Sequence, residues 1–512
     1  MTNRSFLILF LLLLNVIVTK AQWPQWYPTA TAEKVLSLIE SYDKGYLIAG
    51  TISNNNTNKG YGLLIKTDVN GNILWEKLFG DESSLTRFHN VIQTSDGGIA
   101  LSGSINSDTA LFVKLNPCGG VEWSRVLLDR KNILATDIIE LADSSLQAMV
   151  TNWDLGNPYD SKSFFIKLNK NGDFIQIDSL PQNEFCQPNP LATEIIRTND
   201  NNYMITSTTA NIGGQSFWIK TNNEMDKIWD LCWPEFYLTI LGKTIQASNG
   251  DYYTTAGSPT GSAFTNAPKI YKFDQNGTPI KVFDSLKSQM SGYVTPGAIC
   301  MFNDTVVVAG FAFENFNTPY IYSSYLVLTD TTGKKIQEIP LTNSKNLPIE
   351  LIKTYDDKVI ALYQNEDNDI AMCKFEKCIN SNFYLYYSEI NPAAMVYDSL
   401  CNMSILSDTT VLSPLVITGI HEYASKHDLK TNIEIWPNPA FAIVNARLQQ
   451  KSRKGDQIVL VNSLGQIKMV IPTVDPVYLM DIDISRLTEG IYILQHIRQG
   501  ICIETGKFVV KK

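Results

Sequence analysis

Between Glu33 and about Ile390 the chain repeats one pattern seven times, with a period of about fifty residues. Each copy has an apolar strand that ends in a short motif, usually Lys, any residue, and then Asp or Asn. The copies are Lys66-Thr67-Asp68, Lys114-Leu115-Asn116, Lys167-Leu168-Asn169, Lys220-Thr221-Asn222, Lys272-Phe273-Asp274, and the degraded Leu328-Thr329-Asp330 and Lys374-Phe375-Glu376. Such a chain must stack its units or close them into a ring, because one unit alone buries too little surface.

Three further features recur in register with this motif. A Gly usually follows three residues after the acid or amide, where a turn requires positive φ: Gly71, Gly119, Gly172, Gly277 and Gly333. A short polar turn precedes the motif, at Asp43, Asp96, Asp143, Asp200, Asn249, Asn303 and Asp356. An aromatic or aliphatic strand follows the Gly, as in Ile73-Leu74-Trp75, Val121-Glu122-Trp123 and Ile228-Trp229.

Each unit therefore contains four short strands separated by tight turns, which predicts antiparallel sheet. Four strands in such a repeat are typical of one blade of a β-propeller, and seven copies close a ring. We predict an all-β fold in which a seven-bladed β-propeller of four-stranded antiparallel blades occupies residues 22–390. The alternative is a linear β-solenoid, which uses shorter repeats. The Gly-Asn-Ile-Leu-Trp and Asp-Gly-Gly turns resemble those of bacterial quinoprotein-like surface propellers.

Strand alternation divides the connections of such a ring between two rims. The first-to-second and third-to-fourth turns are short and share one rim, which we call the turn rim. The other rim, the loop rim, receives the longer second-to-third and inter-blade connections, where binding residues usually lie. Exposed aromatic side chains there can stack on sugars or dock a peptide. We predict binding residues on the loop rim at Trp153, Tyr159, Phe264, Phe313, Phe316, Tyr320 and Tyr322. The alternative for each is local packing against a blade edge.

Motifs for most catalytic chemistries are missing. The propeller segment contains a single histidine, His89, which we expect to be a core or edge residue, and no Gly-x-Ser-x-Gly elbow, Walker loop or His-Glu-x-x-His motif occurs. Residues 68–72 resemble part of a calcium loop, but their Gly is misplaced for an EF-hand and the turn between the third and fourth strands explains them. We predict no catalytic residue, no metal and no cofactor. Paired carboxylates in the central channel stay open as an alternative, because strands distant in sequence converge there.

Charge and cysteine content describe an exported acidic body. The formal net charge is −9, while the segment from Asn432 onward carries ten Lys or Arg and seven Asp or Glu, so the acidic excess lies before it. An acidic body disfavours nucleic acid and anionic membranes as partners. Eight cysteines permit disulfides along an oxidising route, but their spacing does not choose the pairs.

The last eighty or so residues contain four ordered motifs. They begin with Trp436-Pro437-Asn438-Pro439-Ala440, continue through Val459-Leu460-Val461-Asn462-Ser463-Leu464-Gly465 and Gly490-Ile491-Tyr492, and end with Gly506-Lys507-Phe508-Val509-Val510-Lys511-Lys512. This series resembles the C-terminal sorting domain of proteins exported by the type IX secretion system of Bacteroidota, with Trp436 in place of the usual Tyr. The resemblance implies that residues 432–512 form a small β-sandwich, with residues 391–431 as a linker. It also implies sorting roles for Trp436, Pro437, Asn438, Pro439, Gly465, Gly490, Tyr492, Gly506 and Lys507.

The N-terminus fits the same route. Arg4 precedes an apolar run from Phe6 to Val18, and small residues follow up to Ala21, so residues 1–21 are predicted to be a signal peptide. No later run is long enough for a transmembrane segment. The resemblance implies passage through the periplasm to the outer cell surface or the medium, with the type IX machinery as partner. It also implies cleavage of the tail and release or attachment to surface lipopolysaccharide.

For the exported body the sequence leaves two functions open. The first is a non-enzymatic module that binds a glycan or a protein through the loop rim. The alternative is a surface hydrolase with a carboxylate site in the channel. The low histidine content and the missing motifs favour the binding module.

Overall fold

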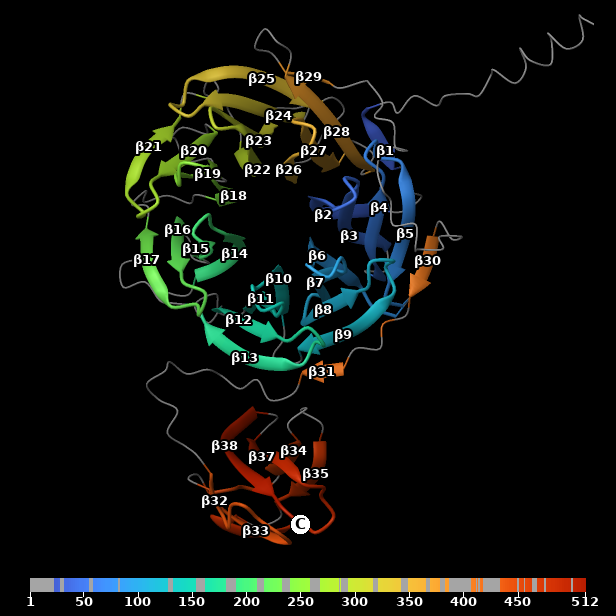
Figure 1. The fold of residues 1–512 in the computed structure, drawn as a ribbon, viewed down its shortest axis with the longest axis vertical. Coiled ribbons are helices and arrows are strands. Elements are labelled where there is room, and N and C mark those ends of the chain that lie inside the picture. The colour runs from blue at the N-terminus through green and yellow to red at the C-terminus, as the bar shows by residue number, and fades with distance from the viewer. Residues whose placement is uncertain are drawn as a thin grey trace, which may run out of the picture.

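The repeats form a ring of seven β-sheets, which confirms the predicted all-β propeller (Figure 1). The count refers to the part of the chain that the computed structural model describes: residues 23–27, 32–54, 59–81, 83–127, 132–152, 162–180, 190–209, 216–232, 240–257, 268–284, 286, 293–315, 321–341, 349–364, 369–377, 383–385, 407–410, 412, 415–417, 433–448, 451–454, 456–462, 467–473, 476–498 and 501–512.

Each blade is an antiparallel meander whose first strand lies nearest the ring axis. Blade 1 comprises β2 (Ala32–Glu40), β3 (Tyr46–Asn54), β4 (Lys59–Thr67) and β5 (Ile73–Phe79). Blade 2 comprises β6 (Thr86–Gln93), β7 (Ile99–Ile105), β8 (Thr109–Leu115) and β9 (Val121–Leu127). Blade 3 comprises β10 (Ile133–Glu140), β11 (Leu146–Asn152), β12 (Lys162–Leu168) and β13 (Phe174–Ser179). Blade 4 comprises β14 (Pro190–Arg197), β15 (Tyr203–Thr209), β16 (Ser216–Thr221) and β17 (Lys227–Cys232).

The remaining blades follow the same order. Blade 5 comprises β18 (Ile240–Gln246), β19 (Tyr252–Gly257), β20 (Lys269–Phe273) and β21 (Pro279–Phe283). Blade 6 comprises β22 (Tyr293–Asn303), β23 (Val306–Asn315), β24 (Ile321–Asp330) and β25 (Lys335–Leu341). Blade 7 comprises β26 (Glu350–Lys353), β27 (Val359–Gln364) and β28 (Ile370–Lys377), with β1 (Gln25–Tyr27) and β29 (Phe383–Leu385) at its outer edge. The inner strands contact one another in sequence order, and β26 contacts β2, so the ring is closed.

The two ends of the propeller segment share the closing blade. Strand β1 pairs with the first half of β28 and β29 pairs with its second half, and both pairings are antiparallel. The hydroxyl of Tyr27 then donates a 2.7 Å hydrogen bond to the carbonyl of Gly71 in blade 1. Trp23 is buried in the core shared by blades 7 and 1. The N-terminal strand therefore fastens the last blade to the first.

Two segments within the predicted linker also belong to the ring. Strand β30 (Ser407–Thr410) pairs in parallel with β5, and β31 (Leu415–Ile417) pairs in parallel with β9. Between them, Leu412 packs against the core shared by blades 1 and 2. These two strands, which follow blade 7 in sequence, thus cover the outer edges of the first two blades (Figure 1).

The tail is a separate sandwich of two sheets, as predicted. One sheet has the order β32 (Glu434–Trp436), β33 (Ile443–Arg447), β36 (Leu479–Asp483). The other has the order β35 (Ile467–Pro472), β34 (Gln457–Asn462), β37 (Gly490–Arg498), β38 (Ile501–Val510). Both sheets contribute apolar side chains to one core, including Val444, Ile482, Leu460 and Phe508. In the described part of the chain, no helix combines the length and hydropathy that crossing a lipid bilayer requires.

Candidate functional site

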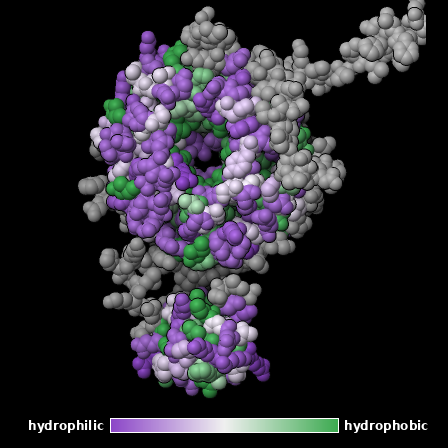
Figure 2. Space-filling view, viewed as in Figure 1, coloured by the Kyte–Doolittle hydropathy of each residue, from purple (hydrophilic) through white to green (hydrophobic). Residues whose placement is uncertain are grey.

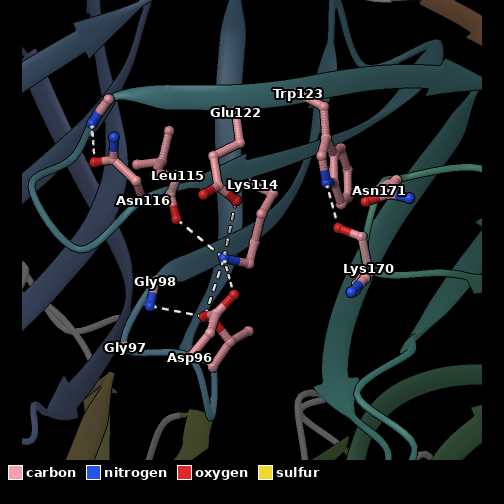
Figure 3. A network of polar contacts seen from close by, with 12 residues as sticks. Asp96, Gly97, Gly98, Lys114, Leu115, Asn116, Glu122, Trp123, Lys170 and Asn171 are labelled. Atoms are coloured by element: carbon pink, nitrogen blue, oxygen red, sulfur yellow. Dashed lines mark hydrogen bonds and ion pairs between the residues drawn. The ribbon is translucent and has the colours of Figure 1, made fainter.

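The turn rim carries a repeated ion pair in six blades of the described chain. In blade 2, Lys114 Nζ lies 3.1 Å from Asp96 Oδ2 and 3.3 Å from Glu122 Oε2 (Figure 3). The corresponding pairs are Lys66–Asp43, Lys167–Asp143, Lys220–Asp200, Lys272–Asp251 and Lys374–Asp356. The sequence marks both residue types but not their contact. In blade 5 the partner is Asp251, whereas the turn residue named from the sequence is Asn249. These pairs tie the third strand to the first turn of the same blade.

Hydrogen bonds and charge lower the pKa of Asp43, Asp96, Asp143, Asp200 and Asp356 among these carboxylates. The Ser145 hydroxyl and the Lys167 ammonium, together with a backbone donor, lower the pKa of Asp143 to about 2. The turn after the third strand is satisfied in the same way: Asp68 Oδ1 accepts the amides of Asn70 and Asn72, each at 2.8 Å. A turn therefore explains the resemblance to a calcium loop. These acids are therefore bonded to the turns and strands of their own blades.

A second repeated contact joins neighbouring blades. Gly172 of blade 3, at φ +76°, lies so close to Trp123 of blade 2 that a Cβ would be 2.6 Å from the indole ring. Trp123 Nε1 donates to the carbonyl of Lys170 at 2.9 Å (Figure 3). Gly277 and Trp229 repeat the close approach between blades 5 and 4. The aromatic and Gly markers are thus two halves of one contact.

Both halves of this contact are missing between blades 3 and 4. The Trp position is the cross-strand partner of the third-strand Lys, and in blade 3 that partner is Gln176. The Gly position of blade 4 is Met225, at φ +64°. Between blades 3 and 4 the indole and the glycine are therefore both missing, whereas between blades 5 and 6 Gly333 is kept and lies against the Phe283 ring.

Charged side chains converge in the central channel, whose opening is visible in Figure 2. Lys243 Nζ, from β18, lies 3.5 Å from Glu194 Oε1 of β14 and 3.6 Å from Glu350 Oε2 of β26. Asp137 of β10 is buried close enough to affect the titration of Lys243. We call Asp137, Glu194, Lys243 and Glu350 the channel cluster. It joins blades 3, 4, 5 and 7 and passes over blade 6.

Small residues make this crossing possible. Blade 6 has Gly297 and Ala298 in its inner strand, and a Cβ on Gly242 of blade 5 would lie 2.3 Å from the carbonyl oxygen of Gly297. The inner strands of blades 5 and 6 therefore approach closely. No bulky side chain of blade 6 stands at these two positions to block Lys243 from Glu350.

The carboxylates of Glu194 and Asp137 both accept hydrogen bonds from the protein. Glu194 Oε2 accepts the amide of Thr244 in blade 5 at 2.7 Å, while its other oxygen faces Lys243. Asp137 Oδ2 accepts the amide of Ile195 in blade 4 at 2.9 Å. The other Asp137 oxygen accepts hydrogen bonds from its neighbour Ile138 and from the Asn90 side chain. These acids fasten inner strands of adjacent blades.

Burial dominates the titration of the channel cluster. It raises the pKa of Glu194 to about 7, against the attraction of Lys243, and it raises the pKa of Asp137 and of Glu350 as well. Burial alone would lower the pKa of Lys243, but the surrounding carboxylates raise it above its ordinary value. Lys243 therefore stays charged, and Glu194 titrates near neutral pH.

This titration predicts a pH-dependent stability. The folded protein keeps a proton on Glu194 between its ordinary pKa of 4.5 and about 7, while the unfolded chain loses it. Stability contributed by this group is thus complete below pH 4.5 and is lost as the pH rises through 7. In Glu194→Gln the loss is absent, so the unfolding free energy of the variant relative to the natural chain should rise by on the order of 2 kcal/mol from pH 5 to pH 8.

Denaturant unfolding at both pH values measures the effect. Glu122→Gln, on the outer strand of blade 2, is the control with the same chemical change. Equal shifts in the two variants would contradict the assignment to Glu194.

Of the predicted loop-rim residues, Phe313 is the one whose side chain the structure describes. Phe313 was expected to be exposed, and this is wrong: it is 2% exposed and lies in the core between blades 5 and 6. Strand β23 runs on to Asn315, so Phe313 continues the alternation of Ala309 and Phe311 on its buried face. Outside the described residues lie Trp153, Tyr159, Phe264, Phe316 and Tyr320, together with the side chain of Tyr322. Their binding role stays a prediction.

Among the described residues, His89 and four cysteines are buried or bonded within the ring. His89 Nδ1 lies 3.1 Å from the carbonyl oxygen of Ala135 in blade 3, and burial lowers the pKa of the ring to about 4. Cys300 and Cys373 are buried thiols whose pKa burial raises to about 12, whereas Cys118 and Cys232 are each in a disulfide. Among described residues, no group of three or more His, Cys, Asp or Glu is arranged to hold a metal ion.

The sorting motifs of the tail meet in space. Asn438 Oδ1 accepts the amide of Val509 at 2.9 Å, and its amide nitrogen donates to the carbonyl of Lys507 at 3.3 Å. Gly506 lets the entering strand approach, because a Cβ there would lie 2.6 Å from Ile435 Cδ1. Gly490 and Tyr492 pair with the same last strand, and Tyr492 is buried. Trp436, Pro437 and Pro439 are exposed beside this contact, and Gly465 lies outside the described residues.

Comparison with known families supports this end of the chain. Residues 434–511 match the model of the secretion system C-terminal sorting domain. This segment is a type IX sorting domain. It directs the chain to the outer surface or the medium and implies contact with the secretion machinery. The signal peptide predicted at residues 1–21 lies outside the described residues.

Solved structures that resemble the chain align with it at low sequence identity. No curated protein matches the chain. A Dyadobacter fermentans protein of unknown function aligns at 9% identity over 60% of this chain and 94% of its own, with a TM-score of 0.37. A polysaccharide lyase described as an ulvan lyase aligns at 10% identity over 71% and 96%, with a TM-score of 0.43. PorZ, a type IX secretion component of Porphyromonas gingivalis, aligns at 12% identity over 95% and 82%, with a TM-score of 0.26. Alignments at these TM-scores carry no argument about activity.

Proposed function

We propose that the exported body is a non-enzymatic module that binds a glycan or a protein through its loop rim. The observation that carries this proposal is the state of the channel cluster. Its best-placed acids, Glu194 and Asp137, accept hydrogen bonds from the backbone of the next blade, and Lys243 faces two carboxylates. Groups occupied in this way hold a ring together and leave little capacity for substrate.

Strand topology supports the location of the binding surface. The connections between β11 and β12, between β19 and β20, and between β23 and β24 all leave the loop rim, since the blades are antiparallel meanders. These connections carry the predicted aromatic residues Trp153, Phe264 and Phe316. The opposite rim consists of short turns whose carboxylates are already bonded. We also propose that the body is related to quinoprotein-like propellers, whose turns it resembles. We propose further that it becomes attached to surface lipopolysaccharide after the tail is cleaved.

The test is ligand binding by the purified chain on arrays of glycans and surface proteins. Replacing Trp153 or Phe316 with Ala should weaken binding of the selected ligand about tenfold or more, as the loss of an interface aromatic does, without lowering the melting temperature. Tyr42→Ala is the matched control, because Tyr42 is an aromatic residue 59% exposed on the turn rim. If both loop-rim variants bind normally and the Tyr42 variant does not bind, the binding site lies on the turn rim and the proposal is wrong.

One observation favours the second candidate, a surface hydrolase. Burial raises the pKa of Glu194 to about 7 and also raises that of Glu350 in the same channel, and glycoside hydrolysis uses a carboxylic acid with a raised pKa beside a second carboxyl group. The binding module explains more of the structure, because Glu194 has both oxygens engaged.

A further inference from the structure

Two cationic side chains lie next to each other where the channel opens on the loop rim. Lys34 of β2 and Arg87 of β6 occupy equivalent positions, two residues before the bulge that interrupts each inner strand, and β2 and β6 are neighbours at the ring axis (Figure 1). Lys34 is exposed and Arg87 is half-buried. In the part of the chain that the structure describes, neither forms an ion pair. The same position is uncharged in blades 3, 4 and 5, where it is Leu134, Leu191 and Ile240.

A tight turn holds the guanidinium of Arg87 in place. Arg87 Nη1 donates a hydrogen bond to Ser107 Oγ, in the turn between β7 and β8. This turn is fixed to the start of β6, because the amide of Leu85 donates to Asn106 Oδ1 and the amide of Asn106 donates to the carbonyl of Leu85, each at 2.8 Å. Asn106 and Ser107 have φ of +54° and +59°, as the central residues of a type I′ turn require. A side chain ordered in advance loses less entropy when it binds an anion.

His89 adds a neutral hydrogen-bond acceptor beside the two cations. Its Nδ1 carries the proton, because the partner at 3.1 Å is the carbonyl oxygen of Ala135, which can only accept. Burial most of all, and then the charges of Arg87 and Lys34, lower the pKa of His89 to about 4. The ring is therefore neutral at neutral pH, with an acceptor at Nε2, and both cations lie close to it.

Hydroxyl groups continue this set of acceptors around the channel. Thr136 and Thr193 take the bulge position of blades 3 and 4 that His89 takes in blade 2. Thr193 is exposed and Thr136 is half-buried, although the chain neighbours on both sides of each are buried. Their hydroxyls donate to the carbonyls of Met149 and Thr206 at 3.4 and 3.2 Å, which leaves oxygen lone pairs to accept from a ligand. We call the following residues the mouth site: Lys34, Arg87, His89, Thr136 and Thr193.

We propose that the mouth site binds an acidic sugar, an oligosaccharide that carries carboxylate or sulfate groups. The inference rests on the proposed function of the loop rim as a binding surface and names the class of its ligand. Lys34 and Arg87 bind the anionic group through charge-assisted hydrogen bonds. His89 and the two threonines accept hydrogen bonds from sugar hydroxyls. An acidic peptide fits less well, because its backbone offers one N–H per residue, whereas a sugar ring carries a hydroxyl on most of its carbons.

The acids of the channel cluster lie one residue further along β10 and β14. Glu194 and Asp137 accept hydrogen bonds from backbone amides of the next blade, and Glu194 also faces Lys243. Their charge is therefore partly neutralised within the ring. The cations at Lys34 and Arg87 belong to other blades and stay available to an anion.

The test is calorimetric binding of the purified full chain to oligogalacturonate, which carries carboxylates, to dextran sulfate and to neutral dextran. The natural chain should bind at least one anionic probe, and neutral dextran about tenfold more weakly or not at all. The better anionic probe identifies the group as carboxylate or sulfate. Lys34→Gln and Arg87→Gln should each weaken binding about tenfold, and together about a hundredfold, because each removes a hydrogen bond from a charged group. Arg87→Lys keeps the charge and should retain most of the affinity.

The double variant Lys334→Gln, Lys454→Gln is the charge-matched control. It removes two exposed lysines, one on the turn rim of blade 6 and one in the tail, and should bind like the natural chain. The melting temperature of every variant checks the fold. Equal losses of affinity in the two double variants would overturn the mouth site, because net charge alone would explain them.

Two further results would overturn the inference. The first is a natural chain that binds neither anionic probe. If it still binds a neutral glycan or a protein through the loop rim, the proposed function stands without the acidic sugar. The second is binding of poly-glutamate as tight as that of the sugars and lost in the Lys34 and Arg87 double variant, which would assign the site to acidic peptides.

Discussion

Replacing Gly172 with Ala is expected to destabilise the propeller by about 2–4 kcal/mol. Two costs add at this position. The residue has φ +76°, which costs an L side chain about 1–2 kcal/mol. The new Cβ would also lie 2.6 Å from the Trp123 ring, so the indole would have to move and strain its 2.9 Å hydrogen bond to Lys170. Denaturant unfolding of the purified chain gives the difference.

Gly97→Ala is the matched control. Gly97 has φ +82°, but the nearest atom to its Cβ would be Pro117 Cγ at 3.5 Å, an ordinary contact. This variant should lose only the conformational share, about 1–2 kcal/mol. Equal losses of unfolding free energy at the two sites would show that the close approach of Gly172 to Trp123 adds no cost to the substitution. Gly277→Ala, which faces Trp229, should behave like Gly172→Ala.

Deleting residues 432–512 is expected to abolish appearance of the protein on the cell surface and in the medium. The deletion removes the whole matched domain while leaving β30 and β31 on the ring. A folded body without its sorting surface should accumulate in the periplasm. Fractionation followed by immunoblotting measures the distribution.

The melting temperature of the truncated chain shows whether the body still folds. The full chain with Gly97→Ala serves as the export control, because it carries a mild loss of stability and an intact tail. Truncated protein on the surface at the natural level would refute the role of the tail.

The repeat could be predicted in detail because it is local. Turn residues, the period and strand alternation all act within one unit, and they locate strands such as β7 and β8 closely. The last blade was harder to foresee. Its outer edge is shared between Gln25–Tyr27 and Phe383–Leu385, which are far apart in sequence and carry no marker of their partner.

Contacts between units were the part that sequence could not supply. Trp123 and Gly172 were both singled out, yet their meeting depends on the rotation from one blade to the next. The same is true of Lys243 and Glu350, which lie in blades 5 and 7 and meet over the inner strand of blade 6. For Phe313 the prediction failed for a different reason: the sequence indicated an irregular loop, whereas β23 continues through this residue.

The central claim is that the channel carboxylates hold the ring together and perform no chemistry. Product release from a panel of polysaccharides, measured for the natural chain and for Glu194→Gln and Glu350→Gln, tests it most directly. The account predicts that all three stay at the level of the protein-free control. Product from the natural chain that falls about a hundredfold or more in either folded variant, as removal of a general acid or base causes, would contradict it.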